Sequence, residues 1–176
     1  MARIPAITTA LIWIAFGTSC ETNPTDSSLE FSLGLSYQEF DQTPHSGWRA
    51  LGDEKRYRQA AELIERYLQR HSELDRSQLA ILHWHAGQML AIAGDSEAAM
   101  KHMSSARVDP EPPTSPLRWN DYVDATVAFL RNDRAKLLAA RELMAKNSPA
   151  DPNLPVVDAL IVHFGESYAT AYRARR

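Results

Sequence analysis

The chain has a single cysteine, Cys20, and only seven glycines among its 176 residues. One thiol cannot form a disulfide within the chain, so packing must stabilise the folded part. The shortage of glycine, together with many Ala, Leu, Arg and Glu residues, favours helices over a fold of strands and turns. The length is that of one domain. We therefore predict a single helical domain without internal cross-links.

The chain also has no excess of basic over acidic residues, and it lacks common catalytic motifs. The chain has 19 Lys and Arg residues against 22 Asp and Glu residues, a net charge of −3, whereas nucleic-acid-binding domains are normally basic. It contains no Gly-rich phosphate loop and no Gly-x-Ser-x-Gly elbow. These absences predict a non-catalytic protein that needs no cofactor or metal and has no nucleic-acid partner.

The N-terminus has the order of a secretory signal. A positive charge at Arg3 precedes an apolar stretch over residues 4–16, and small residues follow at 17–19. This is the order of a signal peptide with its cleavage site. The apolar stretch is shorter than the roughly 20 residues that a membrane-spanning helix needs. We predict a signal peptide over residues 1–19 and export of the remainder.

The residues around Cys20 resemble the lipobox of bacterial lipoproteins. Small residues stand directly before the cysteine, and Ser, Thr and Asn are frequent after it. The resemblance implies that Cys20 becomes the first mature residue and carries a diacylglycerol and an amide-linked acyl chain, a stable anchor. Gly17 departs from the usual Leu, and Glu21 implies the periplasmic face of the outer membrane. The alternative is an ordinary signal cleaved at the same bond, which leaves Cys20 a free or intermolecularly paired thiol.

Residues 20–46 are polar and show no sustained helical period, so we expect the lipidated cysteine to be followed by a flexible tether. An apolar island at residues 29–40 alternates as a strand does but has no obvious partner strand. We expect it to be irregular, with docking on the domain left open.

From residue 47 to 176 the apolar spacing is helical. It predicts helices over about 53–71, 75–93, 96–107, 117–131, 134–147 and 154–163, and a last helix near the C-terminus. Gly94 is expected to end one helix, with Asp95 or Ser96 capping the next. Asn132 and Asp133 are expected to join another pair. Paired helices with tight turns indicate an all-α fold, a short α-solenoid of antiparallel helix hairpins.

Residues 80–113 resemble a tetratricopeptide repeat. The matching residues are His83, Ala86, Gly87, Leu90, Gly94, Asp95, Ala99, Met103 and Ala106, with Pro110 and Pro112 flanking the closing proline slot. The small residues are expected to let two helices approach closely. The resemblance to the other units, over most of residues 53–172, is weaker, and His83 stands where the family has Trp.

In tetratricopeptide arrays the first helix of each unit lines a concave groove that binds protein or peptide partners. The resemblance implies a groove lined by Ile81, Trp84, Gln88, Trp119, Asn120, Tyr122, Asp124 and Thr126. Large aromatic side chains with a polar rim suit peptide recognition. The competing interpretation is that the N-terminal island or the C-terminal helix of the chain fills the groove.

The histidines and aspartates of the expected helices offer two chemical alternatives. His83 and His85 are two residues apart on a helix and point to nearly opposite faces, which disfavours a shared metal ion. Asp121 and Asp124 lie on one helix and suggest an acid–base pair, but a solvated face or an ion pair with Arg131 or Arg134 explains them as well.

The sequence thus predicts an envelope lipoprotein, membrane-anchored through Cys20, that binds a protein partner as an adaptor, assembly factor or immunity-like protein. The alternative function is a small envelope enzyme or ligand-binding protein with a pocket around Trp84, Trp119, Tyr122 and Asp124.

Overall fold

The computed structural model describes residues 24–111 and 117–174, which are helical and contain no β-strand. The predicted all-α fold is confirmed for these residues. In chain order the elements are α1 (Pro24–Leu33), a π-helical turn η1 (Gln38–Gln42), α2 (Trp48–Asp53), α3 (Tyr57–Arg70), α4 (Arg76–Ile92), α5 (Ser96–Ser105), α6 (Trp119–Leu130), α7 (Arg134–Asn147), α8 (Leu154–Val162) and α9 (Tyr168–Arg173).

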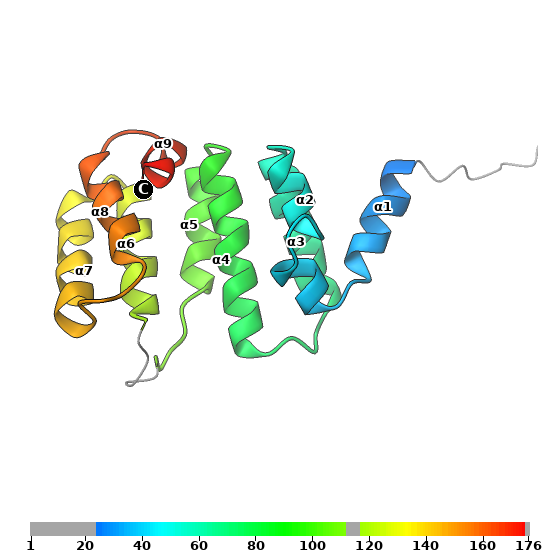
Figure 1. Ribbon diagram of the computed structural model, residues 1–176, viewed down its shortest axis with the longest axis horizontal. Helices are drawn as coiled ribbons and strands as arrows, with labels where there is room; N and C mark the ends of the chain where they lie inside the picture. The colour runs from blue at the N-terminus through cyan, green and yellow to red at the C-terminus, as the bar shows by residue number, and fades with distance from the viewer. Residues whose placement is uncertain (1–23, 112–116, 175–176) are drawn as a thin grey trace, which may run out of the picture.

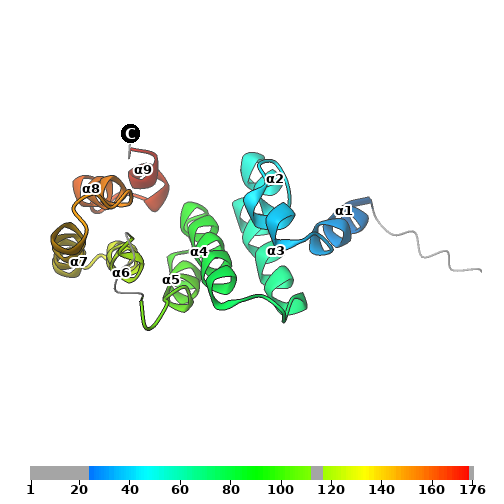
Figure 2. The same cartoon turned by 60° about the horizontal axis from the view of Figure 1, so that its bottom comes forward.

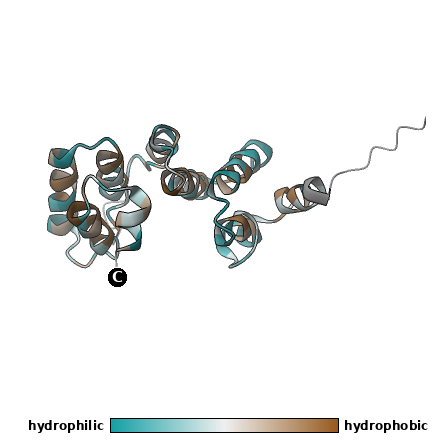
Figure 3. Ribbon diagram, turned by 90° about the horizontal axis from the view of Figure 1, so that it is seen from above, coloured by the Kyte–Doolittle hydropathy of each residue, from teal (hydrophilic) through white to brown (hydrophobic). Residues whose placement is uncertain are grey.

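From α2 on, helices that follow one another in the chain lie side by side, whereas α1 packs on α3, and the long helices from α3 to α7 alternate in direction (Figures 1 and 2). α1 stands at one end of the long axis, and α7 and α8 stand at the other. α9 departs from this order, because it turns back and contacts α4 as well as α8. Hydrophobic and hydrophilic residues alternate along the ribbons (Figure 3), as helices that pack on one side require.

The predicted helix boundaries agree with the structure within a few residues, with one exception. The helix expected over about 53–71 starts four residues later, since α3 begins at Tyr57, and α2, which ends at Asp53, was not expected as a helix of its own. Between them Lys55 has a φ of 61°, a left-handed conformation that no helix continues through. The break turns α2 into a separate short helix that packs on α3.

The turns of the two central hairpins are built alike. Gly94 after α4 has a φ of 85° and Asn132 after α6 has a φ of 57°, conformations that glycine and asparagine tolerate best. An aspartate follows each of them and caps the next helix, Asp95 on the Ala98 amide and Asp133 on the Lys136 amide. These local rules made both turns predictable from the sequence.

The close approach of α4 and α5 takes place at Gly87, as the sequence predicts. A Cβ atom at Gly87 would lie 2.6 Å from Cγ of Met103 and 3.0 Å from the carbonyl oxygen of Ala99. Ala99 and Met103 are fully buried. Residue 87 therefore has to be glycine for the two helices to pack at this distance.

The segment predicted to be a tether is folded over its described part, which corrects both the tether and the boundary at residue 47. Residues 24–33 form α1, and η1 follows. The ring of Phe40, fully buried, stacks on Tyr67 of α3 with centroids 3.7 Å apart. The Tyr67 hydroxyl donates to the carbonyl oxygen of Leu35 at 2.9 Å. The apolar island therefore docks on the domain, and it does so as helix and turn.

Candidate functional site

The eight residues predicted to line a groove are found mainly in the interior. Gln88, Asn120 and Thr126 are buried, and Ile81 is half-buried. Asp124 is the only one of the eight that is exposed. The remaining three, Trp84, Trp119 and Tyr122, are the aromatic residues on which both predicted functions depended.

These three aromatic rings pack against one another between α4 and α6. Trp84 lies with its ring centroid 5.2 Å from that of Trp119 and 4.7 Å from that of Tyr122. Trp84 and Tyr122 are 4% and 3% exposed. Nε1 of half-buried Trp119 donates to the carbonyl oxygen of Ala106 at 2.7 Å. The prediction of an open groove or pocket at these rings is therefore wrong, since neighbouring helices use them as their shared core.

The polar residues of the predicted groove make hydrogen bonds and an ion pair within the protein. Asn120 bonds to the backbone of Val108 in both directions, each at 2.9 Å, and so ties α6 to the chain leaving α5. The hydroxyl of Thr126 donates to the carbonyl oxygen of Tyr122 within α6. Asp124 pairs with Arg107 at 2.5 Å. These contacts give each of the three residues a structural role.

Asp121 and Asp124 form no acid–base pair in a closed site. Asp121 pairs with Arg118 at 3.0 Å, and Asp124 pairs with Arg107. The predicted partners, Arg131 and Arg134, are therefore replaced by arginines that precede the two aspartates in the chain. Both carboxylates border a shallow hollow of about 280 Å³ between α6 and α7.

The C-terminal helix of the chain covers part of the face on which a groove was expected. Tyr168 of α9 and Phe164 lie with ring centroids 6.3 and 6.1 Å from that of Phe129 on α6. Ala171 of α9 is fully buried, and α9 contacts α4. The interpretation in which the chain fills its own groove thus applies to the half near α6 and α8.

The two histidines of α4 point to different partners. Nδ1 of His83 lies 3.1 Å from Nδ1 of His102 on α5, and Nε2 of His102 lies 2.9 Å from a carboxylate oxygen of Glu65 on α3. Nδ1 of His85 lies 2.7 Å from Oδ1 of Asp41. Within residues 24–111 and 117–174 no three His, Cys, Asp or Glu side chains are placed to hold a metal ion together.

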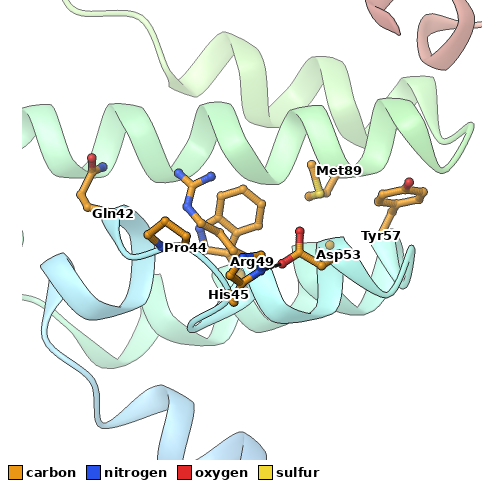
Figure 4. A pocket seen from close by; sticks show the side chains of 9 residues that line it. Gln42, Pro44, His45, Arg49, Asp53, Tyr57 and Met89 are labelled. Atoms are coloured by element: carbon orange, nitrogen blue, oxygen red, sulfur yellow. Dashed lines mark hydrogen bonds and ion pairs between the residues drawn. The ribbon is translucent and has the colours of Figure 1, made fainter.

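The other half of the face is hollowed between α2 and α4 (Figure 4). We call this hollow of about 430 Å³ the α2–α4 trough. It is lined by Gln42, Pro44, His45, Trp48, Arg49, Gly52, Asp53, Tyr57 and Met89. Trp48 and Met89 are buried and form its floor, whereas Pro44, His45 and Asp53 are exposed at its rim. The sequence does not predict this site, because the site lies beside the segment that is expected to be a tether.

Arg49 is held in the trough by three features of its surroundings. Its Nε donates to the carbonyl oxygen of Asp41 at 2.5 Å, and its guanidinium carbon lies 4.4 Å from the ring centroid of Trp48. The Trp48 indole is itself fixed, since Nε1 donates to Oδ1 of Asp41 at 2.8 Å. Figure 4 shows the guanidinium in the space between α2 and α4.

The carboxylate of Asp41 organises this end of the trough although it is itself fully buried. It accepts hydrogen bonds from Trp48, from His85 and from Nε2 of Gln42, the last at 2.5 Å. Burial raises the pKa of Asp41, but the His85 and Trp48 hydrogen bonds and the charge of Arg49 outweigh it and hold that pKa below its ordinary value. The site therefore contains a carboxylate that is ionised at neutral pH behind an arginine.

Cys20 and the predicted signal peptide, residues 1–19, lie outside the described residues, as does Pro112 of the repeat pattern. Among the helices that the structure does describe, none combines the length and apolarity needed to cross a bilayer. Comparison of the chain with protein-family models found no match, and searches of the curated proteins and of the solved structures found none either.

Proposed function

We propose that the chain is an exported, lipid-anchored helical protein of tetratricopeptide type that acts by binding another protein at the bacterial envelope, as an adaptor, assembly factor or immunity-like partner. The observation that carries the binding part is the α2–α4 trough, a preformed hollow with an aromatic and thioether floor, Trp48 and Met89, and an arginine whose terminal nitrogens have no hydrogen-bond partner among the described residues. Apolar floors with a few fixed polar groups suit recognition of peptide segments.

The solenoid arrangement is part of the proposal. Support comes from the packing of chain neighbours, the similar turns at Gly94 and Asn132, and the close approach at Gly87. Stacked hairpins of this kind expose a continuous face to a partner. Here α9 covers the half of that face near α6, which leaves the trough as the accessible half.

The lipid anchor is proposed from the residues around Cys20 alone. Its test is mass spectrometry of the amino-terminal peptide from the membrane fraction, compared with the Cys20→Ser variant. We expect acyl mass on Cys20 in the wild-type protein, and accumulation of the variant as unprocessed precursor. A wild-type peptide that starts at Cys20 without acyl mass would contradict the anchor and leave only export.

The binding role is tested by a photo-crosslinking amino acid placed at Asp53, which is exposed and lines the trough. The control position is Glu142, exposed on α7. In intact cells we expect a discrete crosslinked protein from position 53 and none from position 142. The same set of adducts from both positions would show nonspecific contact and contradict the proposal.

A further inference from the structure

We propose that the α2–α4 trough binds an internal acidic segment of the partner protein, with one carboxylate of that segment on Arg49 and an apolar side chain against Trp48 and Met89. This inference rests on the proposed binding function and adds the chemistry of the partner. It follows from how Arg49 is held, from the charges around it and from the shape of the hollow.

Arg49 is prepared for a carboxylate. Its Nε is occupied by the carbonyl oxygen of Asp41, and its guanidinium lies on the face of Trp48. The two terminal nitrogens make no hydrogen bond or ion pair with any described residue. These nitrogens form the end of a planar fork whose spacing matches the two oxygens of a carboxylate. Because the side chain is already fixed, little conformational entropy is lost on binding.

The other charges at the trough favour an anionic partner. The one acidic residue that lines it, Asp53, is paired with His45 at 2.7 Å. The buried carboxylate of Asp41 already accepts bonds from Trp48, His85 and Gln42. At the far end Nη2 of Arg173 lies 3.5 Å from the hydroxyl of Tyr57. The trough thus contains Arg49, and a second arginine, Arg173, lies beside its Tyr57 end.

The shape of the hollow fits a segment that passes through it. Its lining residues extend from Gln42, before α2, to Tyr57, after α2. In Figure 4 these two side chains lie at opposite ends, with Arg49 and Met89 between them. A chain lying along α2 places one side chain over the buried floor while a neighbouring residue reaches Arg49.

The probe is a phage-displayed library of random dodecapeptides whose C-termini are joined to the coat protein, so that no free peptide carboxylate is present. The target is the purified full-length chain. We expect enrichment of peptides in which Asp or Glu stands within about three residues of a Leu, Met or aromatic residue, since the Arg49 guanidinium lies 4.4 Å from the ring centroid of Trp48 in the floor and side chains close together in the peptide can reach both. Enrichment without acidic residues, or no enrichment, overturns the proposal.

Affinity measurements on an enriched peptide assign the contact. By fluorescence anisotropy, Arg49→Gln and replacement of the peptide's acidic residue by its amide should each weaken binding about tenfold or more. Together they should weaken it hardly more than either alone. Lys146→Gln, which removes a charge from exposed α7, should leave the affinity unchanged. Losses that add up independently contradict a direct carboxylate–Arg49 contact.

A second variant tests the same contact in case Arg49→Gln does not fold. In Gly52→Glu the new carboxylate lies one helical turn from Arg49 and competes for it, and Arg49 itself is retained. Both variants should lose the peptide while keeping the circular-dichroism spectrum of the wild-type chain. If Gly52→Glu binds the acidic peptide as the wild type does, the site is elsewhere and the proposal fails.

Two further outcomes separate this inference from the function on which it rests. Arg49-dependent binding to phosphatidylglycerol vesicles, without enrichment of acidic peptides, would identify a lipid surface and overturn the peptide proposal. A partner captured from position 53 in cells whose binding is indifferent to Arg49→Gln would keep the proposed function and overturn the inference. If no protein is crosslinked from position 53 in cells but acidic peptides clearly bind the trough, the proposed envelope function is contradicted and the binding chemistry stands.

Discussion

Asp41 and His85 are 44 residues apart in the chain, and a 2.7 Å hydrogen bond joins the fully buried carboxylate to the imidazole. The bond connects η1 to the middle of α4 and, through Trp48 Nε1, to the start of α2. It fixes the wall and the floor of the α2–α4 trough at the same time. The segment before residue 47 is therefore a structural part of the domain.

Asp41→Asn is expected to destabilise the protein strongly. The amide keeps the size of the side chain but removes the charge that three donors share, which costs about 2–4 kcal/mol of the free energy of unfolding. Asp53→Asn is the matched control, because Asp53 pairs with His45 at the exposed surface, and it should change this free energy by less than about 0.5 kcal/mol. Urea denaturation of both variants makes the comparison, and equal effects would contradict the network.

Asp41 should also make stability depend on pH in the acid range. Its pKa is lowered in the folded state, because its hydrogen bonds and the charge of Arg49 outweigh burial. The stabilisation is therefore complete above the unfolded value of about 4 and is lost as the pH falls through the folded pKa. The difference in free energy of unfolding between wild type and Asp41→Asn should shrink as the pH drops below about 4. A constant difference would contradict this assignment.

His83 should make stability depend on pH closer to neutrality. Burial lowers the pKa of His83, and the charge of the neighbouring His102 lowers it further. The unfolded chain therefore takes up the proton first, and stability falls as the pH drops below about 6.5 until the folded pKa is passed. His83→Gln should reduce the loss between about pH 7 and pH 5. Urea midpoints at both pH values measure it, with His45→Gln on the exposed surface as control.

Gly87→Ala should destabilise the protein, whereas Gly52→Ala should stabilise it. The Cβ at residue 87 collides with Met103 and with the backbone of α5, and such overpacking costs about 1–3 kcal/mol. A Cβ at Gly52 has its nearest neighbours at 3.7 Å, so the better helix propensity of alanine should stabilise by about 0.5–1 kcal/mol. Thermal unfolding ranks the two, and a stable Gly87→Ala would contradict the close approach.

Trp119→Ala should reveal a role in folding. Trp119 packs on Trp84 and donates to Ala106, so removal of the indole should cost about 2–4 kcal/mol. Trp119→Phe keeps a ring but loses the N–H donor and should cost about 1–2 kcal/mol, since the Ala106 carbonyl loses its donor. Affinity for a trough-binding peptide, measured under conditions in which the variants are folded, should not change. Selective loss of binding in Trp119→Phe would restore the predicted aromatic groove.

Local rules explain why helices and turns were predictable. Gly94 and Asn132 end helices because few other residues adopt a positive φ, and Asp95 caps the next helix because its side chain reaches the Ala98 amide. The small residues at 87 and 99 predicted a close helix pair for the same reason, since only small residues permit that distance. The turns and caps depend on residues within a few positions of one another, and the close pair joins two helices that follow each other directly in the chain.

The candidate site depends on residues far apart, and there sequence reasoning failed. Trp84, Trp119 and Tyr122 have the spacing of an exposed aromatic face, but that spacing is the same whether the rings meet a partner or each other. The apolar island at residues 29–40 was recognisable from the sequence, but its partner was not, and Phe40 of the island stacks on Tyr67 of α3.

The amino-acid sequence by itself determined the helices from α3 onward, the turns at Gly94 and Asn132 and the close pair α4–α5, because backbone preference, capping and small side chains act between residues close in the chain. Only the tertiary structure decided which aromatic residues are sealed in the core, that α9 covers Phe129, and that Arg49 is left facing a hollow. Those outcomes depend on which surfaces pack together and exclude water, and this packing involves residues from the whole length of the chain.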